Sequence, residues 1–330
     1  MRNIVLVFLL TVIFLSGVCS AQSFPDGKLA HTYSVVACDA VTGEMGVAVQ
    51  SHWFSVGSIV SWAESGAGAI ATQSFVNASF GPRGLDLLKQ GNNAEEVLQS
   101  LIASDEGRDY RQLAIVDSEG KVAVYTGKKC IAEAGHIKGD HFSVQANMML
   151  NNTVWPAMAE AYKDNLDEPL AERLVAVLEA AQAEGGDIRG RQSAVLLVVK
   201  GESTGKPWED RLIDLRVDDH SQPVNELKRL LKLFRAYEHM NAGDVAIENN
   251  NVEKALQEYK TAEMMFPSNL EMKYWHAVSL ANIGKVEEAL PIFKQIFSED
   301  TNWRILTQRL PAVDLLMVKE DELKKIMDVK

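Results

Sequence analysis

Residues 31–85 read HTYSVVACDAVTGEMGVAVQSHWFSVGSIVSWAESGAGAIATQSFVNASFGPRGL, and this stretch decides the fold. Alternating side chains predict a first strand over residues 32–39, with Thr32 and Ser34 on one face. A mostly apolar run predicts a second strand over residues 45–50, buried on both faces. The turn-forming residues between these two runs are typical of a β-hairpin.

The same stretch continues with a second pair of strands, predicted over residues 58–62 and 68–72. Helical spacing follows over residues 82–90, and Asn93 has the side chain of a helix N-cap for the next helical run.

Groups of strands and groups of helices then alternate up to residue 217. Further strands are predicted over residues 112–116, 122–125, 142–148, 194–199 and 211–217, and helices begin near Val154 and Pro169. Segregated strands joined by short hairpins favour the α+β class, with antiparallel sheets covered by helices. This pattern does not distinguish a four-layer αββα sandwich from a two-layer domain.

The pattern changes to helical periodicity throughout after residue 222. Small and apolar residues recur here at an offset of 34 residues, the tetratricopeptide period. The matched pairs are Gly243 and Ala277, Ala255 and Ala289, Tyr259 and Phe293, and Ala262 and Ile296. Two such repeats over about residues 236–301, followed by capping helices, would offer a concave groove for a protein or peptide partner, although core packing explains most of the aromatic residues equally well. Because two repeats are few, we expect support from the first domain or from a helix over residues 224–234.

The N-terminus resembles a secretory signal peptide over residues 1–21. Arg2 precedes an apolar run that is too short for a transmembrane span, and Ala21 ends a stretch with small residues at the cleavage positions. We therefore predict a periplasmic or secreted protein without stable membrane insertion, whereas lipid anchoring at Cys19 is the less favoured alternative. The predicted segments are the signal peptide 1–21, an α+β domain 24–222 and a helical part 223–330.

Composition excludes several classes of function. A net charge of −12 argues against binding to nucleic acid or to anionic membranes.

Cys38 and Cys130 would remain after export and could pair or act as separate buried thiols. Their spacing from the nearby histidines does not indicate a metal site, and no cofactor is predicted.

Thr32 is the principal candidate nucleophile. A threonine hydroxyl can attack an amide carbonyl when the threonine's own α-amine is free to act as the base, because that amine titrates near pH 8. The predicted signal cleavage leaves residues 22–31 ahead of Thr32, so a second cut would be needed. The alternative is that Thr32 is an ordinary strand residue. Ser34 and Ser51 are lesser candidates.

Uncharged amides and arginines complete the candidate site. Asn77 and Asn147 could donate to an oxyanion, although Asn77 could equally serve a turn. Arg189 could hold a substrate carboxylate or instead pair with Asp187. The remaining candidates for substrate binding are Gln73, Gln145, Arg111 and Gln192. Gln145 and Asn147 lie on one face of a strand, and their amides need either a ligand or a protein partner.

Residues 31–85, 111–112, 135–147 and 187–193, in this order, resemble segments of domain of unknown function 1028. The resemblance covers about residues 30–231. It implies a four-layer αββα sandwich of the Ntn (N-terminal nucleophile) hydrolase type.

Two hypotheses follow from the sequence. The first is an exported Ntn-type amide-bond hydrolase acting on a small amide or peptide-like substrate. The second is a non-catalytic ligand-binding or scaffold protein. The sequence leaves the substrate and the oligomeric state open.

Overall fold

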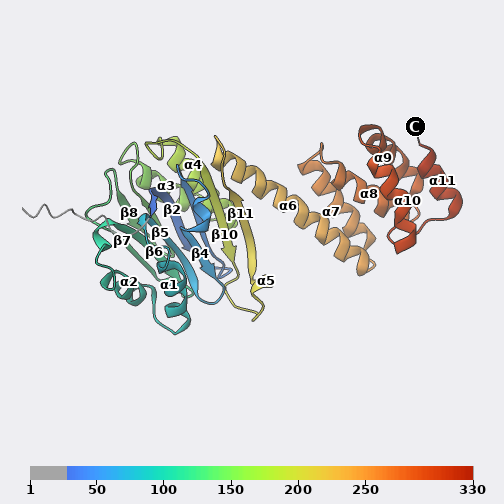
Figure 1. Cartoon of the computed structure of the whole chain (residues 1–330). Coiled ribbons are helices and arrows are strands. Elements are labelled where there is room, and N and C mark those ends of the chain that lie inside the picture. The colour runs from blue at the N-terminus through green and yellow to red at the C-terminus, as the bar shows by residue number, and fades with distance from the viewer. Residues whose placement is uncertain (1–27, 330) are drawn as a thin grey trace, which may run out of the picture.

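The structure is a computed structural model that describes residues 28–329 (Figure 1). The predicted signal peptide, including Cys19, lies outside the described residues. The strands are β1 Lys28–Ala30, β2 Thr32–Cys38, β3 Met45–Ser51, β4 Ser61–Glu64, β5 Gly68–Val76, β6 Arg111–Asp117, β7 Val122–Thr126, β8 Gly135–Lys138, β9 Phe142–Ala146, β10 Ser193–Val199 and β11 Arg211–Val217. The helices are α1 Phe80–Lys89, α2 Ala94–Ala103, α3 Val154–Asp164, α4 Leu170–Ala183, α5 Pro207–Asp210, α6 Pro223–Glu248, α7 Val252–Met265, α8 Leu270–Asn282, α9 Val286–Glu299, α10 Asn302–Arg309 and α11 Glu320–Asp328.

The strands form two antiparallel sheets, which confirms the predicted α+β class. One sheet has the order β1-β5-β6-β7 with β4 also paired to β5, and the other has the order β11-β10-β3-β2-β9-β8. The first predicted hairpin is β2–β3, in which Thr32 lies opposite Ser51.

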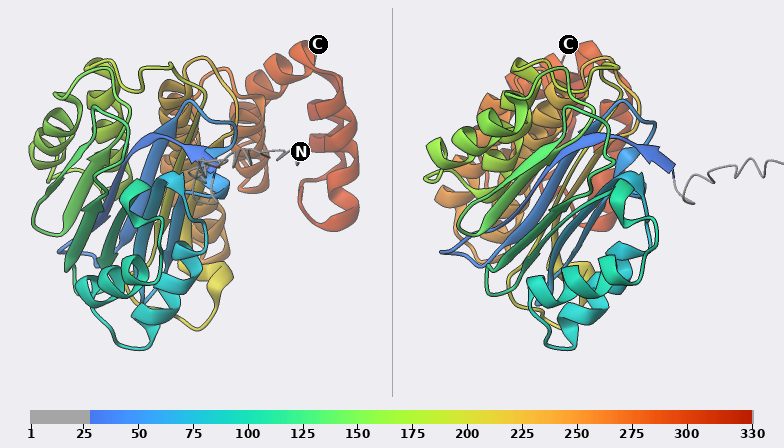
Figure 2. Two further views of the ribbon diagram at one scale, coloured as in Figure 1. Left: turned by 60° about the vertical axis from the view of Figure 1, so that its left-hand side comes forward. Right: turned by 90° about the vertical axis from the view of Figure 1, so that its left-hand side faces the viewer.

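The two sheets face each other across an apolar core, because each buried strand presents one face to the opposite sheet. Val36 and Val49 of one sheet pack there with Ala71 and Val116 of the other. The outer face of the β5 sheet packs against α1 and α2, and the outer face of the β2 sheet packs against α3 and α4. Figure 2 shows these two helix pairs on opposite sides of the sheets.

Five strands differ from the sequence prediction by more than one residue. Strand β1 was not predicted, β5 continues to Val76, and β9 already ends at Ala146. The strand expected at residues 58–62 begins only at Ser61, because Val56–Ser58 forms a 3₁₀ turn in which Ile59 N donates to Val56 O over 3.2 Å. Strand β8 was not predicted, since its four residues are half-exposed or exposed and carry no apolar signal. The predicted N-cap at Asn93 is confirmed, and Glu96 completes a capping box with it.

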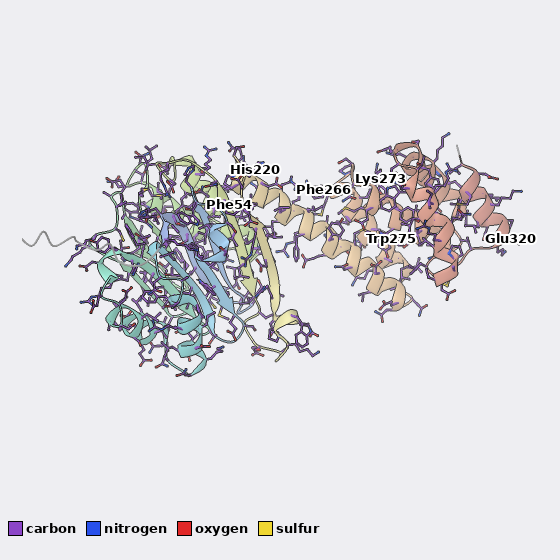
Figure 3. All side chains as sticks on the ribbon, viewed as in Figure 1. Phe54, His220, Phe266, Lys273, Trp275 and Glu320 are labelled. Carbon is purple, nitrogen blue, oxygen red and sulfur yellow. The ribbon has the colours of Figure 1, made fainter. Side chains whose placement is uncertain are left out.

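The C-terminal part consists of helices packed in sequence, attached through the long helix α6. The first half of α6 buries Leu227 and Leu231 against the sheet domain, and its second half packs against α7. All eight residues matched at the 34-residue offset are buried. Trp275 of α8 packs against the cores on both sides of it (Figure 3). Helix α6 therefore contributes to the core of the sheet domain and to the core of the helical part.

The described residues hold no helix long and apolar enough to cross a membrane. Both Cys38 and Cys130 are free thiols, the first buried and the second partly buried. No group of acidic, histidine and cysteine side chains suited to a metal ion occurs within residues 28–329.

Candidate active site at the junction of the two sheets

His31 is the residue at which the chain passes from one sheet to the other. Ala30 ends β1 in the β5 sheet, and Thr32 begins β2 in the opposite sheet. His31 and Thr32 are buried, with exposed fractions of 1% and 0%. The Thr32 hydroxyl donates to the Ala30 carbonyl over 2.7 Å.

Two side chains donate to the main-chain carbonyl of His31, which belongs to the peptide bond preceding Thr32. The Ser51 hydroxyl lies 2.5 Å from this oxygen, and Arg189 Nη2 lies 2.8 Å from it. Two donors, one of them charged, would stabilise negative charge developing on the oxygen. The carbonyl is thus polarised in the way that attack on its carbon requires.

Asp187 holds the guanidinium of Arg189 in place. Its carboxylate accepts from Arg189 Nε over 3.0 Å and from Nη2 over 2.6 Å, a bidentate ion pair. Asp187 also accepts from the main-chain N–H groups of Arg189 and His52, and only 3% of it is exposed. The turn after it needs Gly190, whose φ is +115°.

Hydrogen bonding assigns the tautomer of the His31 ring. Asn147 Nδ2 donates to the carbonyl of Thr32, so its Oδ1 faces His31 as an acceptor. His31 Nδ1, 2.6 Å from that oxygen, must therefore carry the hydrogen. Burial lowers the pKa of His31, so the ring is neutral near pH 7. Its other nitrogen, Nε2, is then a buried hydrogen-bond acceptor that has no partner among the described residues. The ring also meets Phe75 edge-on, with centroids 5.7 Å apart.

A buried network of amides lies beneath the site, between the two sheets. Gln112 Oε1 accepts from Gln73 Nε2 over 2.7 Å and from Asn147 Nδ2 over 2.9 Å. Gln73 and Asn147 each also donate to the carbonyl of Thr32, over 3.3 Å. The network therefore holds the Thr32 carbonyl from both sheets, through Gln73 of β5 and through Asn147, which follows β9.

Gln145 belongs to the same network but one step further from Thr32. Its Nε2 donates to the Ser34 hydroxyl over 2.6 Å, and Ser34 donates to Gln73 Oε1 over 2.5 Å. The Ser143 hydroxyl donates to the other end of the amide, Gln145 Oε1, over 2.9 Å. These contacts satisfy the Gln145 amide within the protein.

Three other predicted residues lie outside this cluster. Asn77 Oδ1 accepts from the main-chain N–H and from the hydroxyl of Ser79, just before α1. Asn77 therefore serves a turn, the alternative to the role of oxyanion donor. Arg111 binds Asp105 and the carbonyl of Phe75. Gln192 donates to Asp219 over 3.2 Å at the surface. The structure thus brings together Thr32, Gln73, Asn147 and Arg189, with Gln145 behind them.

Sequence reasoning missed the roles of His31, Ser51 and Gln112. A signal for Ser51 was available, because extending the second predicted strand from residue 50 by one residue brings Ser51 to the end of the hairpin where Thr32 lies. Neither His31 nor Gln112 carries a comparable local signal, because their partners lie on other strands.

The fold and site define a mixed α+β protein of two facing antiparallel sheets with a buried polar site where β1 passes into β2. The model of the family of unknown function DUF1028 matches residues 32–227, more than half of the chain, and the protein belongs to that family. No curated protein matches the chain.

Two solved structures resemble the protein. Protein SPO2555 from Silicibacter pomeroyi, itself described as DUF1028, is 30% identical, with a TM-score of 0.55 over 62% of this chain and 88% of that one. The ancestral β-subunit Anbu from Yersinia bercovieri is 12% identical, with a TM-score of 0.29 over 60% of this chain and 92% of that one.

Proposed function

We propose that this protein is a self-processing amide-bond hydrolase of the N-terminal nucleophile type, with Thr32 as nucleophile. One observation carries the proposal. The carbonyl that must be attacked to free the Thr32 amine, that of His31, accepts from Ser51 and from Arg189. The family match also begins at Thr32 itself, so the shared sequence starts with the proposed nucleophile.

Processing would proceed as an acyl shift from nitrogen to oxygen. The Thr32 oxygen attacks the His31 carbonyl carbon through a five-membered ring, and Ser51 and Arg189 stabilise the oxyanion. The carbon–nitrogen bond then breaks, and the proton of the hydroxyl ends on the Thr32 nitrogen. Water hydrolyses the resulting ester, which leaves a carboxylate on His31 and a free hydroxyl and α-amine on Thr32.

The freed α-amine would then serve as the base in turnover. Such an amine titrates at a pKa of about 7.7–8.0, so it accepts a proton near neutral pH, whereas a peptide nitrogen does not. Arg189 and Ser51 stay in position as oxyanion donors, and Asn147 and Gln73 hold the Thr32 carbonyl. A small amide or peptide-like compound is the proposed substrate class.

Architecture supports the same proposal. Helices on the outer faces of two facing sheets suit the four-layer αββα sandwich of Ntn hydrolases. We also propose that residues 1–21 direct export to the periplasm or medium.

The helical part is proposed to bind a protein or peptide as tetratricopeptide-type repeats do. The 34-residue offset and the burial of its matched residues support repeats. A pocket between α7, α8 and α9, lined by residues that include Met264, His276 and Ile292, would be part of that surface.

A non-catalytic binding protein is the competing function, and one observation favours it. Thr32 is fully buried, and its hydroxyl donates to Ala30 rather than to a base. Intact mass and N-terminal sequencing of the full chain, purified from an exporting host, decide between the two. We expect a mature chain that begins at Thr32, whereas a chain that keeps the His31–Thr32 bond supports the binding protein.

A further inference from the structure

We propose that the slot filled by residues 28–31 is the binding site for the acyl side of a peptide substrate. The substrate would be an extended peptide that adds as an edge strand to β5. Its last residue before the bond that Thr32 cleaves would have a planar side chain that donates a hydrogen bond. The residue before that one would be small. This inference rests on the proposed function and names its substrate class.

The first argument is that β1 is a separable edge strand. Its three residues pair antiparallel with β5, Lys28 opposite Val76 and Ala30 opposite Ser74. Lys28 and Leu29 are exposed, so this position is open to solvent along its outer side. Removal of residues 28–31 would take away the strand partners of Ser74 and Val76 at this edge of β5. A strand edge without its partner is the requirement for adding a peptide strand.

The second argument is chemical. The ester formed during self-processing joins the acyl group of His31 to the Thr32 oxygen. The intermediate of substrate turnover joins the acyl group of the substrate to the same oxygen. Both acyl groups need the same oxyanion donors, Ser51 and Arg189, so both carbonyls occupy one position. The residues before that carbonyl therefore lie where residues 28–30 lie in the uncleaved chain.

The third argument is that the slot is selective at two positions and permissive at a third. The His31 ring is buried against Phe75 and donates to Asn147, so a planar donor fits there. Ala30 is fully buried in the core between the sheets, which leaves little room for a larger side chain. Leu29 is 44% exposed, which predicts weak selectivity at its position.

Peptide binding to the mature full chain tests the proposal. The probe is the peptide Lys-Leu-Ala-His with a fluorescent label on its exposed first residue, and binding is followed by anisotropy. Unlabelled Lys-Leu-Ala-His, Lys-Leu-Ala-Phe, Lys-Leu-Leu-His and Gly-Leu-Ala-His then compete with it. Because the ligand is varied rather than the protein, folding of variants does not affect the result.

We expect Phe in the last position and Leu in the third position each to weaken binding roughly tenfold, since the first leaves a buried acceptor unsatisfied and the second does not fit. Gly in the first position should change affinity by less than about twofold, because its side chain is in solvent. Equal affinity of all four peptides, or no binding, in a chain whose mass shows a free Thr32 overturns the substrate class and leaves the hydrolase standing. A chain that retains residues 28–31 covalently overturns both.

Discussion

Arg189 donates to the main-chain carbonyl of His31 over 2.8 Å, although the two residues are 158 positions apart in the chain. The same guanidinium also donates to both carboxylate oxygens of Asp187, through Nε and Nη2. Its positive charge thus points at the carbonyl of the one peptide bond whose cleavage would free the Thr32 amine.

Arg189→Lys should slow cleavage between His31 and Thr32 about a hundredfold, because an ammonium group cannot contact Asp187 bidentately and the His31 oxygen at once. The rate is measured as the fraction of cleaved chain against time by intact mass. Arg191→Lys is the matched control, since Arg191 is exposed and donates to Gln222. Equal rates in both variants would remove Arg189 from the proposed mechanism.

Thr32→Ala should abolish cleavage, because no hydroxyl remains to attack the His31 carbonyl. Thr32→Ser should restore it at a reduced rate, since serine keeps the oxygen and loses only a methyl group. N-terminal sequencing of both variants locates the cut. Cleavage of the alanine variant at the same bond would show that another protease makes the cut.

The stability of the uncleaved chain should depend on pH through His31. Burial lowers the pKa of His31 from 6.5 in the folded chain, so the unfolded chain takes up a proton first as the pH falls. His31 therefore costs no stability well above pH 6.5 and destabilises the fold progressively below it. Melting temperatures of Thr32→Ala at pH 7.5 and 5.0 measure this effect.

The double variant Thr32→Ala, His31→Gln is the control, because glutamine can donate to Asn147 and does not titrate. Burial also lowers the pKa of His136, which contributes the same sign to both proteins. A drop of equal size in the two proteins would exclude His31 as its cause.

Gln112→Leu should destabilise the sheet domain by about 3 kcal/mol, because it leaves buried groups of several partners without a hydrogen bond. Besides accepting from Gln73 and Asn147, its amide donates to Thr126 and to the carbonyl of Ala146. Urea unfolding measures the change. Gln99→Leu is the control on the exposed face of α2 and should change stability by less than about 0.5 kcal/mol. A similar loss in both variants would mean that the network adds no stability of its own.

Local sequence patterns predicted most elements, for reasons that lie within single segments. Alternation along residues 32–39 places Val36 toward the opposite sheet and Val35 toward the helices, as the structure has them. The capping residues Asn93 and Glu96 are three positions apart and need no tertiary partner. Strand β8 and the 3₁₀ turn at residues 56–58 were missed, because neither has an apolar periodicity of its own.

By itself, the sequence determined the α+β class, the first β-hairpin and the apolar faces of the helices, since each depends on a short-range period or on a local turn. Only the tertiary structure decided that His31 joins the two sheets and that Arg189 and Ser51 meet at its carbonyl. Those contacts depend on how the sheets stack and where the loop at residues 187–190 folds back, and no periodicity along the chain encodes the distance between two sheets.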